Sequence, residues 1–190
     1  MLWDVLRGRS KKRANNLDAL FTVPTAAITL QTAMGLAPTG AGGVCYRAAA
    51  GVGFAQTQAD VVSLISQSTD GTAPEVEVVD DEFGFTWLVV QDDPEDVAGL
   101  CTDLHAVNTA LEANGFADGL LCSMVPFAGN GQKVGLVYLY KQGTFYPFAP
   151  LEGRRRDNML ELAVRDQLAG ELPIEPDLQR WMALWGAPGL

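Results

Sequence analysis

Histidine and cysteine are scarce in this 190-residue sequence, which limits the chemistry it can carry. His105 is the only histidine, and the three cysteines, Cys45, Cys101 and Cys122, are widely spaced. An odd number of cysteines at these spacings fits neither a disulfide framework nor a paired zinc-binding motif. We therefore expect buried free thiols, and the sequence predicts no bound metal and no cofactor.

Long apolar runs are also missing. No stretch is long enough to cross a membrane. The N-terminus does not resemble a secretion signal, because its cations follow its apolar residues and no long apolar region comes next. With 48% hydrophobic and 19% charged residues, the composition is that of an ordinary soluble protein. These features predict a cytoplasmic chain with enough residues for one domain with a sizeable core.

Positive charge is rare in the middle of the chain. Between residues 14 and 153 the only cations are Arg47, Lys133 and Lys141. The net charge of −10 and a pI near 4.4 argue against general nucleic-acid binding. Residues 1–13 differ from the rest: five cations against Asp4 give +4, which leaves −14 for the remainder of the chain.

The first fifteen residues are expected to form a basic segment, separate from a single α+β domain over residues 16–190. Leu2, Trp3, Val5 and Leu6 are spaced to give one apolar helical face, and the cations follow. Two interpretations remain open: a frayed terminus, or a weak and reversible contact with a membrane interface that carries anionic lipids. The candidate membrane contacts are Trp3, Arg7, Arg9, Lys11, Lys12 and Arg13.

Two hairpins and one long helix are the clearest local signals. Alternating apolar residues flank an acidic turn at 80–82, which predicts strands over 75–79 and 83–90. Asn130-Gly131 predicts a second hairpin, with strands over 119–127 and 133–141 and the latter strand central in the sheet. A helix is expected over 92–115, with Asp93 as N-cap and Pro94 at its first position. Its buried stripe is Val97, Leu100, Leu104, Val107 and Leu111.

The other segments complete a ββα rhythm. A short helix is expected over 16–21, ended by Pro24. Residues 25–34 fit a strand or a helix, and their β-branched residues favour a strand. We expect a loop over 35–43, a strand over 44–50, helices over 54–67 and 154–170, and a last short helix opened by Pro176. The sequence thus predicts an α+β fold, with a mainly antiparallel sheet built from hairpins and helices packed on it.

Two common catalytic or nucleotide-binding motifs are absent. The glycine-rich "GAGGV" at 40–44 lacks the Lys-Ser/Thr ending of a phosphate-binding loop, and there is no G-x-S-x-G nucleophile motif. Cys101 and His105 lie four apart on a predicted helix, so they are neighbours on its surface. This pair would suit a hydrolase, but such a pair alone is a weak signature.

Two acidic clusters can be interpreted either as local structural features or as a binding surface. "VDDEF" (79–83) lies at a hairpin turn and "QDDPED" (91–96) at a helix start, where carboxylates have local roles. Alternatively, the two clusters together form an acidic face that a basic partner recognises.

An aromatic stretch followed by three arginines is the most distinctive local feature. In "TFYPFAP" (144–150), the rings of Phe145, Tyr146 and Phe148 form either a strap over the core or an exposed interface. Arg154–Arg156 fall at the expected start of the 154–170 helix, where cations oppose the helix dipole. Either internal acids, including Asp157 and Glu161, compensate them, or an external anion does. The candidate partner-binding residues are Phe145, Tyr146, Phe148, Arg154, Arg155 and Arg156.

Seven segments resemble one known family. They are "NLDALF" (16–21), "LHAVN" (104–108), "LVYLYK" (136–141), "GTFYPFAP" (143–150), "RRDN" (155–158), "LPIEPDL" (172–178) and "WGAPGL" (185–190). In these segments the chain, from about residue 16 onward, is similar to PspAB, the PspA-associated protein family of actinobacteria and archaea.

The resemblance implies association with phage shock protein A (PspA), a cytoplasmic protein that coats and maintains stressed membranes. It also implies gene proximity to an HtpX-type membrane-bound zinc metalloprotease, whose H-E-x-x-H motif is absent here. No catalytic residues are established for the family. We therefore expect a non-enzymatic adaptor of the envelope stress response that binds PspA or the protease near the inner face of the membrane. The alternatives are a chaperone-like, homodimeric peptide-binding module and a Cys101/His105 hydrolase.

Overall fold

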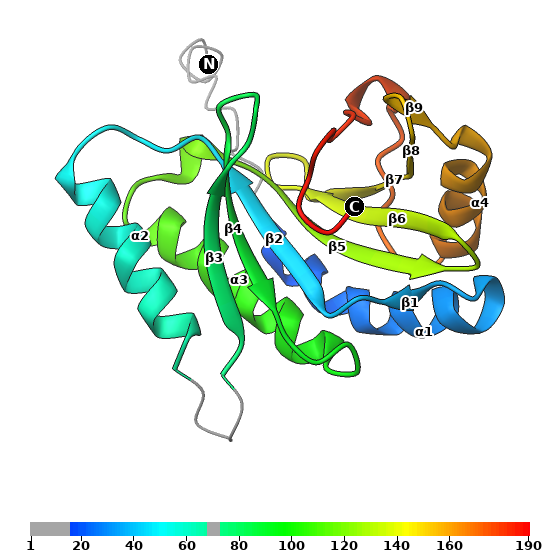
Figure 1. Cartoon of the computed structure of the whole chain (residues 1–190), viewed down its shortest axis with the longest axis horizontal. Helices are drawn as coiled ribbons and strands as arrows, with labels where there is room; N and C mark the ends of the chain where they lie inside the picture. Colours follow the sequence, from blue (N-terminus) through cyan, green and yellow to red (C-terminus); the bar gives the residue numbers. More distant parts are fainter. Residues whose placement is uncertain (1–15, 68–72) are drawn as a thin grey trace, which may run out of the picture.

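The computed structural model describes residues 16–67 and 73–190, whose centre is a seven-stranded sheet (Figure 1). The strand order is β3-β4-β2-β5-β6-β7, and β1 pairs with β5 beyond the end of β2. Each ladder of this sheet is antiparallel. The strands are β1 Ala37–Pro38, β2 Ala41–Tyr46, β3 Glu75–Asp80, β4 Thr86–Gln91, β5 Leu120–Gly129, β6 Gln132–Leu139 and β7 Thr144–Phe148. The expected α+β fold with a mainly antiparallel sheet is confirmed.

Helices from four parts of the chain pack on one face of this sheet. They are α1 Val23–Met34, α2 Val52–Ile65, α3 Val97–Ala113 and α4 Asn158–Leu168, with 3-10 turns at η1 Leu17–Thr22, η2 Ala117–Gly119 and η3 Leu178–Arg180. Apolar side chains of all four helices join one core with one side of the strands. We call this side the helical face.

Both predicted hairpins are present. β3 pairs with β4 around the acidic turn, and β5, β6 and β7 follow one another as a meander. β6 lies between β5 and β7, as expected for a central strand. Its Val134, Leu136 and Tyr138 are buried on the helical face, whereas Val137 is buried on the other.

The predicted stripe of α3 is confirmed, because all five of its residues are buried. The helix begins later than expected, at Val97. Its N-cap is Asp96, whose carboxylate accepts a hydrogen bond from the Gly99 amide at 2.8 Å. Asp93 instead accepts from the Glu95 amide at 2.9 Å, within the turn before the helix.

The strand expected over 25–34 is wrong, since these residues form α1. Val23, Ala26, Ala27 and Leu30 are buried at helical spacing, which outweighs the strand propensity of the neighbouring threonines and Ile28. Pro24 lies in the first turn of α1, where a proline is tolerated, and so does not end the preceding turn. The first ββα unit is therefore missing, and β2 pairs instead with β4 and β5.

The loop expected over 35–43 is also partly wrong, because β2 already begins at Ala41 and ends at Tyr46. Two of its glycines make room for larger side chains. A Cβ added at Gly42 would lie 2.9 Å from Leu100 of α3, and one at Gly43 would lie 3.1 Å from the Trp87 ring. "GAGGV" therefore serves close packing on both faces of the sheet.

The expected C-terminal helices are shorter than predicted. Arg155–Arg156 form a two-residue strand, β9, paired with β8 Pro150–Leu151. The helix α4 begins only at Asn158, and its N-cap Asp157 accepts from the Leu160 amide at 3.0 Å. After Pro176 the structure has only the 3-10 turn η3.

The opposite face of the sheet is covered by the C-terminal segment, residues 173–190. Trp181 and Ala187 are buried there against Tyr146, Phe148 and Met124. In Figure 1 this segment, in red, crosses β5 and β6 on the side away from α1. We call this side the open face, because the described residues cover it incompletely.

Two glycine replacements are expected to act in opposite directions on stability. A Cβ at Gly129 would overlap the backbone oxygen of Gly35, so Gly129→Ala should lower the free energy of unfolding by about 1–3 kcal/mol. Gly53, in the first turn of α2, has open space around the same position, so Gly53→Ala should raise it by up to about 1 kcal/mol. Urea unfolding of both variants measures the two changes, and equal changes would contradict the packing at Gly129.

The predictions for the N-terminus lie outside the described residues. They comprise the basic segment 1–15 and its membrane-contact candidates Trp3, Arg7, Arg9, Lys11, Lys12 and Arg13. Within residues 16–67 and 73–190, no helix has the length and apolarity needed to span a bilayer.

Candidate functional site

The open face holds an apolar groove with a volume of about 430 Å³. This size is within the usual range for ligand-binding pockets. Its walls are the tip of the β3–β4 hairpin and the C-terminal segment, and its floor is the sheet. The groove is lined by Cys45, Asp81, Phe83, Phe85, Trp87, Leu121, Cys122, Leu139, Tyr146, Met182, Ala183, Leu184 and Trp185.

The hairpin wall consists of aromatic side chains held by one carboxylate. Oδ1 of Asp81 accepts hydrogen bonds from the backbone amides of Phe83 and Phe85, both at 2.9 Å. Its Oδ2 accepts from Nε1 of Trp87 at 3.2 Å. Asp81 thus has a local role in the turn, and that role is to present the aromatic wall.

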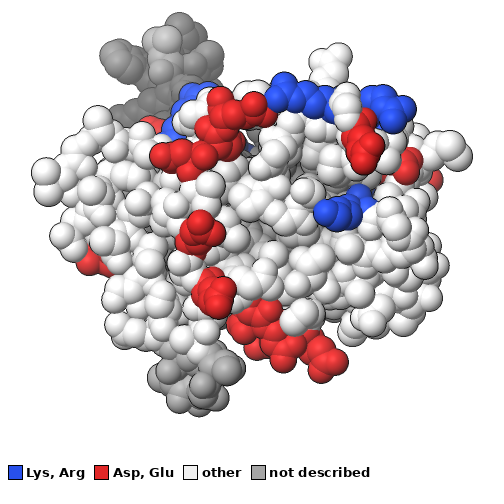
Figure 2. All heavy atoms as spheres, viewed as in Figure 1, with Lys and Arg blue, Asp and Glu red and all other residues white. Residues whose placement is uncertain are grey.

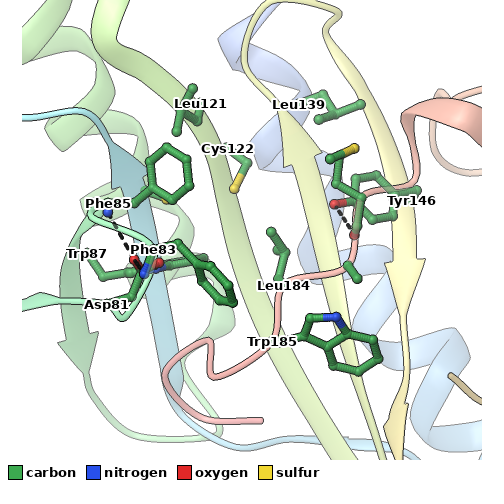
Figure 3. A pocket seen from close by; sticks show the side chains of 13 residues that line it. Asp81, Phe83, Phe85, Trp87, Leu121, Cys122, Leu139, Tyr146, Leu184 and Trp185 are labelled. Carbon is green, nitrogen blue, oxygen red and sulfur yellow. Dashed lines mark hydrogen bonds between the residues drawn. The ribbon is translucent and has the colours of Figure 1, made fainter. Parts of the chain in front are cut away.

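The floor owes part of its shape to a β-bulge. The pairing of β2 with β5 shifts between Cys45, opposite Cys122, and Tyr46, opposite Leu120. Leu121 and Cys122 are consecutive, yet both line the groove, because the bulge interrupts the alternation of side chains. Figure 3 shows Phe83 and Phe85 on one side, Leu139 and Tyr146 on the other, and Cys122 between them.

The C-terminal wall is fixed to the sheet by aromatic and polar contacts. The ring of Trp181 stacks on Tyr146, with centroids 6.0 Å apart, and the ring of Trp185 meets the Phe148 ring edge-on at 5.2 Å. The Tyr146 hydroxyl donates to the Met182 carbonyl at 2.9 Å, and Nε1 of Trp181 donates to the Glu175 carbonyl at 3.0 Å. These contacts hold Leu184 and Trp185 at the edge of the groove.

The three aromatic residues predicted to bind a partner are buried. Phe145, Tyr146 and Phe148 are exposed by only 1%, 1% and 0%. Phe145 packs in the helical core, and Phe148 packs beneath Trp185. Only Tyr146 reaches the groove, as part of its floor. This burial favours a strap over the core rather than an exposed interface. Phe145 and Phe148 are therefore not candidates for contact with a partner.

The three arginines do not oppose a helix dipole, because α4 begins after them. Arg154 lies at the rim of the groove, where its Nη2 is 2.6 Å from Oε1 of Glu82 and its guanidinium lies over the Phe83 ring. Arg155 is exposed and donates to the Glu152 carbonyl at 3.1 Å. Internal acids therefore pair with Arg154, through Glu82, and with Arg156, through Glu161.

Arg156 is part of a buried network beneath the strap. Its Nε lies 2.8 Å from Oε1 of Glu161, a carboxylate only 3% exposed. The same oxygen accepts from the Ala149 amide at 2.9 Å, and Nη1 of Arg156 donates to the Trp181 carbonyl at 2.6 Å. The network therefore joins the strap, α4 and the C-terminal wall of the groove.

The arrangement of Cys101 and His105 gives no support to a nucleophilic pair. Cys101 is fully buried, and burial raises the pKa of its thiol to about 12, whereas a reactive cysteine needs a lowered pKa. His105 contacts η1 rather than the thiol of Cys101: its Nε2 lies 3.2 Å from Oδ1 of Asp18, and its ring packs on Phe21.

The acids before α3 influence a carboxyl group within that helix. Burial raises the pKa of Asp103 to about 6, and the negative charges of Asp92 and Asp96 add to the shift. Between the ordinary pKa of an aspartate and about pH 6, the folded chain holds a proton that the unfolded chain has lost, so the free energy of unfolding falls as pH rises.

Asp103→Asn should accordingly remove this fall and make the protein more stable than wild type at neutral pH. Urea unfolding of both proteins from about pH 4 to about pH 7 measures it. Parallel curves for the two proteins would contradict the raised pKa.

Sequence reasoning missed most of the groove. Of the candidate residues within 16–67 and 73–190, only Tyr146 lines it and only Arg154 lies at its rim, against Phe83. A usable signal was present in "EFGF" (82–85), which places two phenylalanines in an otherwise acidic turn; Phe83 is 49% exposed. Among the described residues there is no cluster of three or more potential metal ligands.

Comparison with known protein families gives a match. The family model PspAB, PspA associated protein B, matches residues 1–189 and so includes the first fifteen residues, which the sequence motifs did not cover. No curated protein and no solved structure matches the chain. Because the family model spans nearly the whole sequence, the chain belongs to the PspAB family.

Proposed function

We propose that this chain is a non-enzymatic accessory protein of the envelope stress response, and that its groove binds PspA. The observation that carries the proposal is the groove, an apolar concavity that the side chains of residues 16–67 and 73–190 leave open. The family supports an association with PspA, and an open apolar groove supports binding of a protein segment. We propose no catalytic residue, because the Cys101 thiol is buried with a raised pKa and the His105 imidazole contacts Asp18.

Charges around the groove indicate the chemistry of the bound segment. Figure 2 shows acidic side chains gathered over β3 and the tip of the β3–β4 hairpin. Glu75 and Glu77 are exposed on β3, with Asp80 near the tip, and none of the three has an ion-pair partner among the described residues. We therefore infer that the segment of PspA inserts apolar side chains and carries basic residues beside them.

A membrane setting remains part of the proposal. PspA acts at membranes, so we propose a cytoplasmic protein that works near the inner face of the membrane. Residues 1–13 then provide a weak lipid contact through Trp3 and the basic cluster. An HtpX-type protease is the other partner that the family resemblance implies.

Titration calorimetry with purified full-length PspA tests the proposed function. Saturable binding of PspA by the full chain is the expected result. The soluble part of the protease and vesicles that contain anionic lipid serve as parallel ligands. If PspA gives no saturable binding while the protease does, the partner is wrong; if none of the ligands binds, the proposal fails.

The groove also favours one second candidate, a chaperone-like module that binds unfolded apolar segments. Such a module would bind many unrelated sequences with similar affinity. It would also suppress aggregation of a denatured test protein at stoichiometric amounts. A PspA-specific adaptor would do neither, so an aggregation assay separates the two functions. Light scattering on the purified protein tests the homodimer that this candidate implies.

A further inference from the structure

Two of the three cysteines lie directly opposite each other at the floor of the groove. Cys45 of β2 pairs with Cys122 of β5 in the antiparallel ladder. Both are free thiols, and both belong to the apolar cluster of the open face. Their side chains therefore project from the same side of the sheet, next to each other.

The backbone spacing of such a pair suits a disulfide. Directly opposed residues of antiparallel strands have Cα atoms about 4.5–5.5 Å apart, and disulfides span Cα separations of about 4.4–6.8 Å. The proximity of the two thiols has a further sign: the neighbouring Cys45, together with burial, raises the pKa of Cys122. A bond between them would need side-chain rotation and little movement of the strands.

Access distinguishes this pair from the third cysteine. Cys45 and Cys122 are only 3% and 5% exposed, but they line a groove that is open to small molecules. Cys101 is 0% exposed, lies in the helical core and does not line the groove. A small polar oxidant that enters the groove thus meets two thiols together and does not meet the third.

We propose that Cys45 and Cys122 form a cross-strand disulfide when a hydroperoxide enters the groove. One thiol, as its thiolate, attacks a peroxide oxygen; the O–O bond breaks, a sulfenic acid forms, and water or an alcohol leaves. The sulfur of the second thiol then attacks the sulfenic sulfur, the S–O bond breaks, and water leaves. The two thiols give up two electrons to the peroxide, and both thiol protons end in the leaving molecules.

Disulfide formation would change the groove without the help of a partner. It links β2 to β5 across the middle of the sheet and replaces two thiols on the floor with an apolar bridge. The raised pKa of Cys122 keeps its thiolate rare at neutral pH, so the reaction is expected to be slow and to accelerate as pH rises. A dithiol reductant reverses it.

Treatment of the full chain with hydrogen peroxide, followed by unfolding, alkylation and mass spectrometry, tests the proposal. We expect the loss of two hydrogen atoms per chain and a fall in alkylated thiols from three to one, with Cys101 as the remaining thiol. Peptide mapping should recover one linked pair that contains Cys45 and Cys122.

Single variants complete the test. Cys101→Ser should still form the link, whereas Cys45→Ser and Cys122→Ser should not. The proposal is overturned if both thiols stay reduced after prolonged treatment at raised pH, if each goes separately to sulfinic acid, or if Cys101 is the linked residue. The wild-type peptide map decides the matter even if a variant does not fold.

Discussion

Replacing Arg156 with alanine is expected to lower the free energy of unfolding by about 3–5 kcal/mol, the usual cost of leaving one partner of a buried ion pair alone. Glu161 would keep its hydrogen bond from the Ala149 amide but lose the guanidinium at 2.8 Å. The Trp181 carbonyl would lose its donor and the Phe148 ring the cation above it. Urea unfolding at neutral pH, followed by tryptophan fluorescence, measures the change.

The same substitution two residues earlier is the matched control. Arg154 and Glu82 form an exposed pair, with side chains 60% and 56% exposed. Exposed pairs contribute at most about 1 kcal/mol, so Arg154→Ala should leave stability almost unchanged. The double variant Arg156→Ala/Glu161→Gln should recover part of the loss, because no buried charge is left unpaired. Equal effects of the two single arginine replacements would contradict the buried network.

Replacing Phe83 with aspartate is expected to weaken the binding of PspA by at least about 30-fold, which corresponds to the loss of about 2 kcal/mol at an interface hot spot. Phe83 lies in the hairpin wall, and the residue is 49% exposed. The new carboxylate would place a charge against the apolar segment in the groove. Because Phe83 is half exposed, the fold should remain intact, which circular dichroism checks.

The control for this variant lies on another surface. Met159 is 84% exposed, belongs to α4 and does not line the groove. Met159→Asp introduces the same charge into an exposed apolar position and should leave the affinity for PspA unchanged. If both variants bind PspA as wild type does, the groove is not the binding site; if both lose affinity equally, net charge rather than the groove is responsible.

The parts of the fold that follow from local sequence were predictable. The hairpin at Asn130-Gly131 and the stripe from Val97 to Leu111 depend on neighbouring residues only. The strand prediction for residues 25–34 was wrong because their apolar residues fit both a strand and a helical period. Contacts with distant helices favour the helix; Leu30, for instance, is fully buried in the helical core. The prediction that Arg155 and Arg156 begin a helix was wrong because they form a two-residue strand, β9, which is too short to show a pattern in the sequence.

The groove was less accessible to sequence reasoning, for a physical reason. Its two walls, around residues 81–87 and 182–185, are about a hundred positions apart and meet only when the C-terminal segment crosses the sheet. The bulge that turns Leu121 toward the groove also interrupts the alternation of side chains, so no sequence pattern indicates it. The aromatic neighbours of Tyr146 in the sequence suggest an exposed interface, but its ring packs in the cluster of the open face, where Trp181 of the C-terminal segment stacks on it.

The central claim, that the groove contacts PspA, is tested most directly by a photo-crosslinking amino acid at position 83. Benzoylphenylalanine there retains an aromatic ring in the hairpin wall, and the same residue at position 159 of α4 serves as the comparison. Irradiation with PspA should give a covalent complex from position 83 and none from position 159. Crosslinks from position 159 alone, or from neither position, would contradict the assignment of the groove as the PspA-binding site.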